Sequence, residues 1–216
     1  MGRSGQGESP LEPKIIGTPV STATPTDEIY ERYLRKAISE INELQHELLA
    51  IADETHVPVL GSGHPLADIF LLKHTPQQAE IAEGVAFFGR AGNALLKSLQ
   101  RLDVDPLAIY GTNCLKFGTE DETQAAPWLT RELHIVQPKL IIVMGEASTR
   151  FLDGLAFPLA DPVSGMEIGV LHRFTPTIEA LVTPDIDGAL DDQATKTAFW
   201  NAFMTLGPWW AELPPY

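Results

Sequence analysis

Four short apolar runs, separated by segments with helical periodicity, constrain the fold of this chain more than any other feature of its sequence. The clearest run is Leu140–Met144 (LIIVM), which is apolar at every position and therefore suits a strand that is buried on both faces. Strands of this kind that alternate with helices form a parallel sheet covered by helices. The sequence thus predicts an α/β fold, a three-layer α/β/α sandwich with a central, mostly parallel four-stranded sheet. The predicted strands are 67–72, 107–113, 140–144 and 179–183, and the predicted helices around them are 92–102, 125–136, 147–152 and 192–206.

The N-terminal part of the chain divides into a tail and a long helix. Residues 1–25 are rich in Gly, Ser, Thr and Pro and are predicted to be disordered, whereas residues 26–216 are predicted to form a single domain. Thr26, followed by two acidic residues, is typical of a helix N-terminus, and this helix is predicted to continue to about residue 52. Its apolar seam could pair with a partner protein as a coiled coil, but packing on the chain's own domain is favoured because three heptads are few. The seam consists of Tyr30, Leu34, Ala37, Ile41, Leu44, Leu48 and Ile51.

The charge and the cysteine content exclude several classes of protein. A net charge of -14 repels polyanions, so weak binding to duplex DNA is expected, and Lys97, Arg101 and Lys116 are too scattered to form a basic patch. The single cysteine, Cys114, excludes an internal disulfide and a multi-cysteine metal site, and a buried apolar role is favoured for it. No apolar run has membrane-spanning length and the N-terminus lacks the apolar region of a signal peptide, so a cytoplasmic protein without membrane contact is expected.

Ligands of parallel α/β sheets bind beyond the carboxyl ends of the strands. The segments that follow the predicted strands are 73–77, 113–117, 145–146 and 184–188. General catalytic motifs do not identify the site. The sequence GSG at 61–63 precedes a strand and is therefore no dinucleotide fingerprint, and the sequence contains no P-loop, no G-x-S-x-G and no H-E-x-x-H.

Four stretches of the chain, in this order, match the motifs of one known family. VLGSGHPLADIFLL is similar to the pattern V-x-G-x-G-N-P-x-A-x-I-x-F-V, and GVAFFGRAGNALL is similar to G-x-P-F-V-G-R-A-G-x-L-L. IYGTNCLKF is similar to V-Y-I-T-N-V-V-K-C, and QPKLIIVMGEAS is similar to x-P-x-V-I-V-x-L-G-x-x-A. These are motifs of the uracil-DNA glycosylase superfamily, and the chain most resembles its iron–sulfur, family-four branch. The resemblance extends from about Val57 to Phe203 and implies that family's α/β/α fold.

The resemblance implies a base-binding role for two residues, Phe87 and Asn113. Phe87 lies where the family has a phenylalanine that stacks on an extruded base, and the neighbouring glycines allow the backbone to present the ring. Asn113 lies where the family has an asparagine whose amide reads the polar edge of uracil, since an amide offers both a donor and an acceptor. Each residue could instead have a purely structural role. Phe87 would then be a ring in the core, and Asn113 would cap the loop backbone at the end of its strand.

At the positions of the family's catalytic motifs the sequence departs from the pattern. The family's G-E-x-P-G aligns with residues 73–77, so His74 replaces the carboxylate and Lys73 replaces the first glycine. Lys73, like Lys116, is expected to be an ordinary surface cation. In the later motif, Asp185 stands in place of a histidine that would donate to the departing base, unless His172 upstream serves instead.

These departures leave the catalytic residues unknown, with His74 and Asp185 as the candidates. A histidine close to Asp185 or Asp187 would form an acid/base pair, although a hydrogen-bonded loop histidine is the commoner arrangement. Asp191 also replaces a family arginine near the DNA phosphate. A carboxylate at these positions would repel both a uracil anion and a phosphate.

The four cluster cysteines of the family-four branch are also missing. Their positions fall near His46, Leu49, Phe117 and Ala125, so the resemblance does not extend to an iron–sulfur cluster and no cofactor is expected. Apolar packing by Phe117 and the leucines is expected in its place.

Three functions remain open from the sequence. The favoured one is a glycosylase-like fold that has lost uracil excision and binds a nucleobase, a nucleotide, a single-stranded nucleic acid or a protein partner in the ancestral cleft. The alternatives are an active DNA base-excision glycosylase with an altered catalytic set that uses His74, and an unrelated small-molecule enzyme. A cleft shared by Phe87, Asn113, His74 and Asp185 would support descent from a base-binding site.

Overall fold

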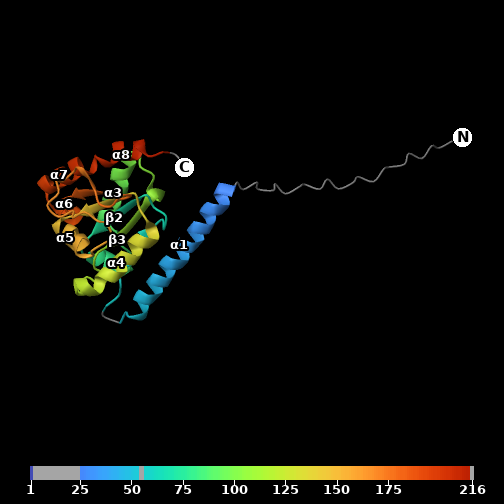
Figure 1. Cartoon of the computed structure of the whole chain (residues 1–216), viewed down its shortest axis with the longest axis horizontal. Coiled ribbons are helices and arrows are strands. Elements are labelled where there is room, and N and C mark those ends of the chain that lie inside the picture. Colours follow the sequence, from blue (N-terminus) through green and yellow to red (C-terminus); the bar gives the residue numbers. More distant parts are fainter. Residues whose placement is uncertain (2–24, 54–55, 215–216) are drawn as a thin grey trace.

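The centre of the molecule is a six-stranded mixed sheet, seen in a computed structural model that describes residue 1 and residues 25–53 and 56–214 (Figure 1). The strand order is β1-β3-β2-β4-β6-β5. The four inner strands run parallel, and they are β3 (Ile109–Asn113), β2 (Ile69–Lys73), β4 (Leu140–Met144) and β6 (Glu179–Thr183). The outer strands β1 (Ser62–Gly63) and β5 (Leu171–Arg173) pair antiparallel to their neighbours.

The predicted four parallel strands are therefore confirmed, whereas the predicted number of strands in the sheet was too low. The two edge strands contain only two and three residues and are not fully buried. Strands this short leave no apolar periodicity in the sequence, because an edge strand is stabilised by pairing with its neighbour more than by burial.

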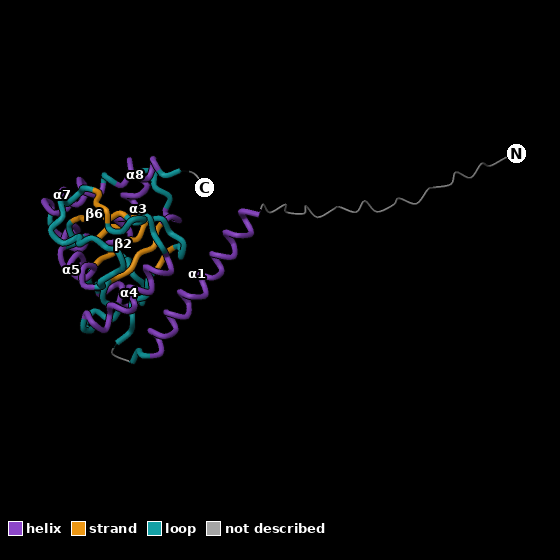
Figure 2. The backbone as a smooth tube through the Cα atoms, in the orientation of Figure 1, coloured by secondary structure: helices purple, strands orange, loops and turns teal. Residues whose placement is uncertain are grey.

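Helices cover both faces of the sheet (Figure 2). Successive side chains of a strand point to opposite faces, so Phe70 and Leu72 lie on one face of β2 whereas Ile69 and Leu71 lie on the other. The first face, called the α4 face below, packs against α4 (Glu122–Val136) and α5 (Glu146–Gly154). The second, the α3 face, packs against α3 (Arg90–Arg101), α6 (Ile186–Asp191), α7 (Gln193–Phe203) and α8 (Leu206–Glu212). This arrangement confirms the three-layer sandwich.

Helix α1 (Pro25–Ala50) packs on α4 through the C-terminal part of its seam. The seam residues Ala37, Ile41, Leu44 and Leu48 are buried, whereas Tyr30 is half exposed and Ile51 lies beyond the end of the helix. The N-terminal half of α1 extends away from the sheet (Figure 1), and the predicted disordered tail lies outside the described residues. None of the described helices is both long and apolar enough to cross a membrane.

Candidate functional site

The ring of Phe87 is positioned by an unusual backbone conformation and by two glycines. Phe87 has a φ of 59°, a left-handed conformation that non-glycine residues rarely adopt. Its backbone N–H donates to a carboxylate oxygen of Glu80. A Cβ added at Gly92 would lie 2.0 Å from the carbonyl oxygen of Phe87, and one at Gly111 would lie 2.7 Å from Cδ2 of its ring. Both glycines are therefore needed to seat Phe87 against strand β3.

Asn113 ends β3 with a side-chain amide that has no hydrogen-bond partner. The residue is 0% exposed, and among the described residues neither its Nδ2 nor its Oδ1 forms a hydrogen bond. A buried polar group without a partner costs about 1–3 kcal/mol, and native structures contain few of them. Because Asn113 lies two residues after Gly111, its side chain points to the same face of the sheet as the ring of Phe87. The unpaired amide therefore faces the same side of the sheet as the ring of Phe87.

Lys73 at the end of β2 is buried, which corrects the expectation of a surface cation. Its side chain is 1% exposed, and its Nζ donates to Glu80 Oε2 at 2.5 Å and to Asp187 Oδ2 at 2.8 Å. The ammonium also lies over the ring of Phe87, 5.6 Å from the ring centroid. Lys73 pairs in register with Asn113, so the two side chains are neighbours on the α3 face. One cation therefore joins the Phe87 ring to two carboxylates, on the strand next to Asn113.

Lys116 is buried as well, but on the α4 face. It is 0% exposed and its Nζ donates to Oε2 of Glu132 on α4, to the hydroxyl of Thr112 and, at 3.0 Å, to the carbonyl oxygen of Asn113. The hydroxyls of Tyr110 and Thr112 donate to Oε1 of Glu132 at 2.9 and 3.2 Å. Burial, reinforced by the Glu132 carboxylate, raises the pKa of Tyr110 well above its usual range. Every polar group of this network is satisfied within the protein, which indicates a structural role.

The two candidate catalytic residues have partners outside this cluster. His74 Nε2 lies 3.2 Å from Oε1 of Glu122, and the His74 ring meets the edge of Phe151 at a centroid distance of 6.2 Å. Asp185 is exposed and caps α6, where its Oδ2 accepts a hydrogen bond from the backbone N–H of Gly188 at 3.0 Å. The structure therefore gives His74 a different partner from the two that the sequence suggested, and Asp187 pairs with Lys73 instead.

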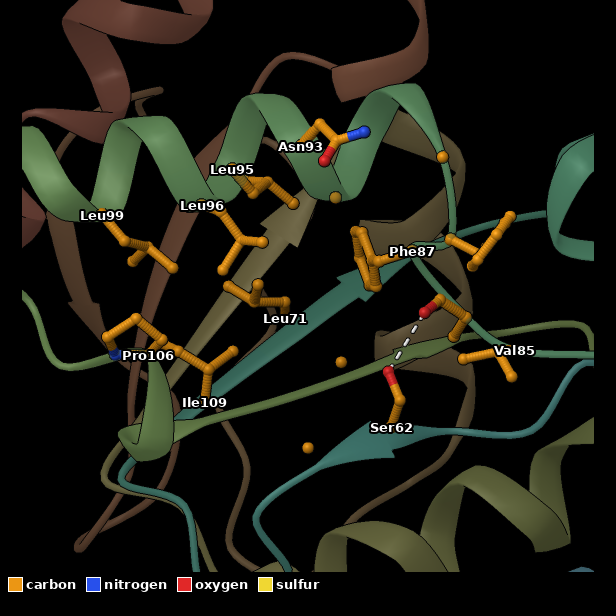
Figure 3. A pocket seen from close by; sticks show the side chains of 16 residues that line it. Ser62, Leu71, Val85, Phe87, Asn93, Leu95, Leu96, Leu99, Pro106 and Ile109 are labelled. Atoms are coloured by element: carbon orange, nitrogen blue, oxygen red, sulfur yellow. Dashed lines mark hydrogen bonds between the residues drawn. The ribbon is translucent and has the colours of Figure 1, made fainter.

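Two cavities lie beside the cluster. The larger cavity, of about 420 Å³, is lined by Phe87, Leu71, Gly111 and apolar residues of α3. Ser62 of β1 lies on the side of this cavity opposite α3 (Figure 3). The smaller, of about 210 Å³, is lined by Glu80, Phe88 and Asp187 among others. Asn113 lines neither of them. The amide of Asn113 is therefore closed off, although Phe87 and the two carboxylates each border a cavity.

The positions that the resemblance gives to cluster cysteines do not fit an iron–sulfur cluster. His46 and Leu49 on α1 are exposed, Phe117 is half-buried and Ala125 is buried, and none of the four supplies a thiolate. Phe117 and the leucines were expected to fill this place, and for Leu49 that expectation is wrong, because 49% of this residue is exposed. Leu44 and Leu48 pack on the domain instead, and Arg131 of α4 binds the carboxylate of Glu47 next to them.

The Cys114 thiol is expected to be inert in the folded protein. Burial raises the pKa of this thiol far above its usual range, and the thiolate is the reactive form. Iodoacetamide at pH 8 should therefore leave native protein unlabelled and should label it fully in denaturant, as followed by intact mass spectrometry. Labelling of native protein at the rate of the denatured chain would contradict the buried placement.

Comparison with known proteins identifies relatives with a described activity. A model of the uracil DNA glycosylase superfamily matches residues 60–204, which include Lys73, Phe87 and Asn113. A type-4 uracil-DNA glycosylase of Sulfurisphaera tokodaii is 32% identical over 103 residues, which are 44% of this chain and 47% of the relative. A type-4 uracil-DNA glycosylase of Saccharolobus solfataricus is 32% identical over 103 residues, 44% of this chain and 48% of the relative. The chain thus spans about half the length of the curated relatives it matches.

Proposed function

Because the chain belongs to the uracil-DNA glycosylase superfamily, we propose that it binds a nucleobase between Phe87 and Asn113 and has lost the excision of uracil. The observation that carries this proposal is the amide of Asn113, which is fully buried and has no partner within the described part of the chain. A protein gains nothing in stability from such a group, since it bears the cost of desolvation without a hydrogen bond. A base edge that enters beside Phe87 would supply both the missing donor and the missing acceptor.

The charges around this site support binding without excision. Cleavage of the glycosidic bond leaves negative charge on uracil, which glycosylases must stabilise with a donor or a cation. The cation over the Phe87 ring on the α3 face is Lys73, and it is already shared between the carboxylates of Glu80 and Asp187. The three groups together carry one net negative charge when all are ionised, which opposes a second anion at short range.

The candidate catalytic residues are engaged with other partners and so do not compensate. Asp185 is an exposed carboxylate occupied with the N-terminus of α6, and His74 is oriented toward Glu122. The alternative, an active glycosylase that uses His74, would draw on this His74–Glu122 pair. It requires His74 to turn toward the α3 face, away from Phe151.

Wild-type protein is therefore expected to leave uracil in a single-stranded oligonucleotide uncleaved. The measurement is strand breakage after alkali, which reports abasic sites, with a type-4 glycosylase as positive control. Robust excision by wild-type protein that disappears in His74→Ala would establish the alternative.

Binding is tested by titration of wild-type protein with free uracil, cytosine, adenine and guanine. We expect one of these bases to bind and Asn113→Ala or Phe87→Ala to weaken that binding about tenfold or more, because a lost buried hydrogen bond or ring contact is worth about 1–3 kcal/mol. Glu31→Ala, which alters an exposed ion pair on α1, is the matched control. Equal binding by Asn113→Ala and wild type would rule out the amide as the reader of the base.

For a nucleic-acid partner, the extruded base of a single strand suits this site better than a duplex. The net charge of -14 opposes phosphate, and Asp191, at a position where the family has an arginine, forms an ion pair with Arg90 at 2.8 Å. A protein partner could use the exposed N-terminal half of α1, where Ile29, Tyr30 and Tyr33 point to solvent.

A further inference from the structure

The side chain of Lys73 reaches the space in which a base would lie against Phe87. Its Nζ is 5.6 Å from the centroid of the Phe87 ring, within the range of a cation–π contact. Its backbone pairs in register with Asn113, so its side chain leaves the sheet beside the Asn113 amide. Gly111 lies against the same ring from the side of the sheet. From these contacts we infer that Lys73 is an internal plug, which occupies the base site and must move before a base can bind. This inference rests on the proposed function.

The position of Lys73 accounts for the burial of the Asn113 amide. Asn113 is 0% exposed and borders neither cavity, although Phe87 borders the larger cavity and Glu80 borders the smaller one. The Lys73 side chain contacts Phe87, Glu80 and Asp187 at once. At this position the resembling motif has a glycine, which leaves the volume free. A lysine adds four methylene groups and an ammonium there, a volume comparable with that of a small ring.

Two carboxylates hold the plug in place. Glu80 is itself fixed, because it accepts hydrogen bonds from the backbone N–H groups of Gln77 and Phe87. Asp187 is less constrained, with 16% of its side chain exposed, and it borders the 210 Å³ cavity. The ion pair with Asp187 therefore lies closest to solvent, and movement of the ammonium toward that cavity would uncover the amide of Asn113.

If a base binds only to molecules in which the plug is open, the apparent affinity for the base equals the intrinsic affinity multiplied by the open fraction. If about one molecule in ten is open, removal of the plug tightens binding about tenfold. The affinity for a base then depends mainly on the volume of the side chain at position 73, and the charge of that side chain has a smaller effect.

The test compares Lys73→Ala with Lys73→Met. Both variants remove the ammonium and leave Glu80 and Asp187 without their cation, so the loss of stability that comes from the unpaired carboxylates is matched. Only alanine empties the volume, because methionine nearly retains the length of lysine. Two readouts are measured. One is the affinity for the free bases uracil, cytosine, adenine and guanine, and the other is hydrogen exchange of the Asn113 side-chain amide followed by NMR.

We expect Lys73→Ala to bind a base about tenfold or more tightly than wild type, and Lys73→Met to bind like wild type. The Asn113 amide should exchange faster in Lys73→Ala than in Lys73→Met even when no base is present. Equal exchange in the two variants, or weaker base binding by Lys73→Ala than by wild type, would overturn the plug. Faster exchange without any base binding would leave the plug standing and refute the proposed base binding.

Asp187→Asn provides a second variant in case the Lys73 variants do not fold. It removes one of the two charges that hold Lys73 and retains the size of the side chain. The Asn113 amide should then exchange faster than in wild type, and base affinity should rise by a smaller factor than in Lys73→Ala. Unchanged exchange in folded Asp187→Asn would count against an opening toward the 210 Å³ cavity.

Discussion

Replacing Glu132 with alanine is expected to lower the free energy of unfolding by about 3–5 kcal/mol, which is a large part of the stability of a typical domain. Glu132 is 0% exposed and accepts hydrogen bonds from Lys116, Tyr110 and Thr112. Its removal leaves the ammonium of Lys116 buried without a counter-charge and leaves two hydroxyls without their acceptor. The loss is measured by chemical denaturation at pH 7.

A double variant separates the cost of the unpaired charge from the loss of packing. Lys116→Met combined with Glu132→Leu removes both charges and fills the space with apolar atoms, so it should be clearly more stable than Glu132→Ala alone. Glu146→Ala serves as the surface control, because its ion pair with Arg150 is largely exposed and should have little effect. A double variant as unstable as Glu132→Ala would show that shape, and not charge, dominates at this position.

The sequence predicts the inner part of the sheet well because burial on both faces leaves a local signal. Leu140–Met144 and Glu179–Thr183 are strands with the predicted bounds. The edge strand Ser62–Gly63 has no such signal, since it forms only through its pairing with Tyr110 and Gly111 of β3. Helix α1 shows the intermediate case. Its periodicity predicts the helix, but which part of the seam is buried depends on packing against α4, which is distant in the chain.

For the candidate site, the sequence identifies Phe87 and Asn113 only through the resemblance to a family. It could not identify the role of Lys73, because the burial of a lysine depends on partners that are distant in the chain. Asp187 lies 114 residues from Lys73, and Glu80 lies seven residues away on another element. One signal was available. Lys73 directly follows the wholly apolar segment 69–72, so its first carbons had to emerge from the buried core.

The same reasoning explains why both lysines were expected at the surface. Lysines are rarely fully buried unless they are paired. Lys116 finds Glu132 on α4, and Lys73 finds Glu80 and Asp187 on the α3 face. Each pairing joins residues that only the folded sheet brings together.

Replacing Gly92 with alanine is expected both to destabilise the fold by about 1–3 kcal/mol and to abolish base binding. The new Cβ would lie 2.0 Å from the carbonyl oxygen of Phe87, a backbone atom that cannot rotate away. Phe87 already has a left-handed backbone, fixed by its N–H bond to Glu80. The segment must therefore shift as a whole, and the ring moves away from Gly111 and Asn113.

Gly154→Ala is the matched control for this experiment. Gly154 is the last residue of α5, and a Cβ there meets no atom within 4 Å. Because alanine favours a helix over glycine by about 0.5–1 kcal/mol, this variant should be as stable as wild type or slightly more stable, with unchanged base binding. Denaturation midpoints and titrations with free bases measure both effects. Gly92→Ala could lose stability and still bind the base as wild type does. In that case the placement of the Phe87 ring against β3 does not create the binding site. The role of Phe87 as the stacking face would then have to be abandoned.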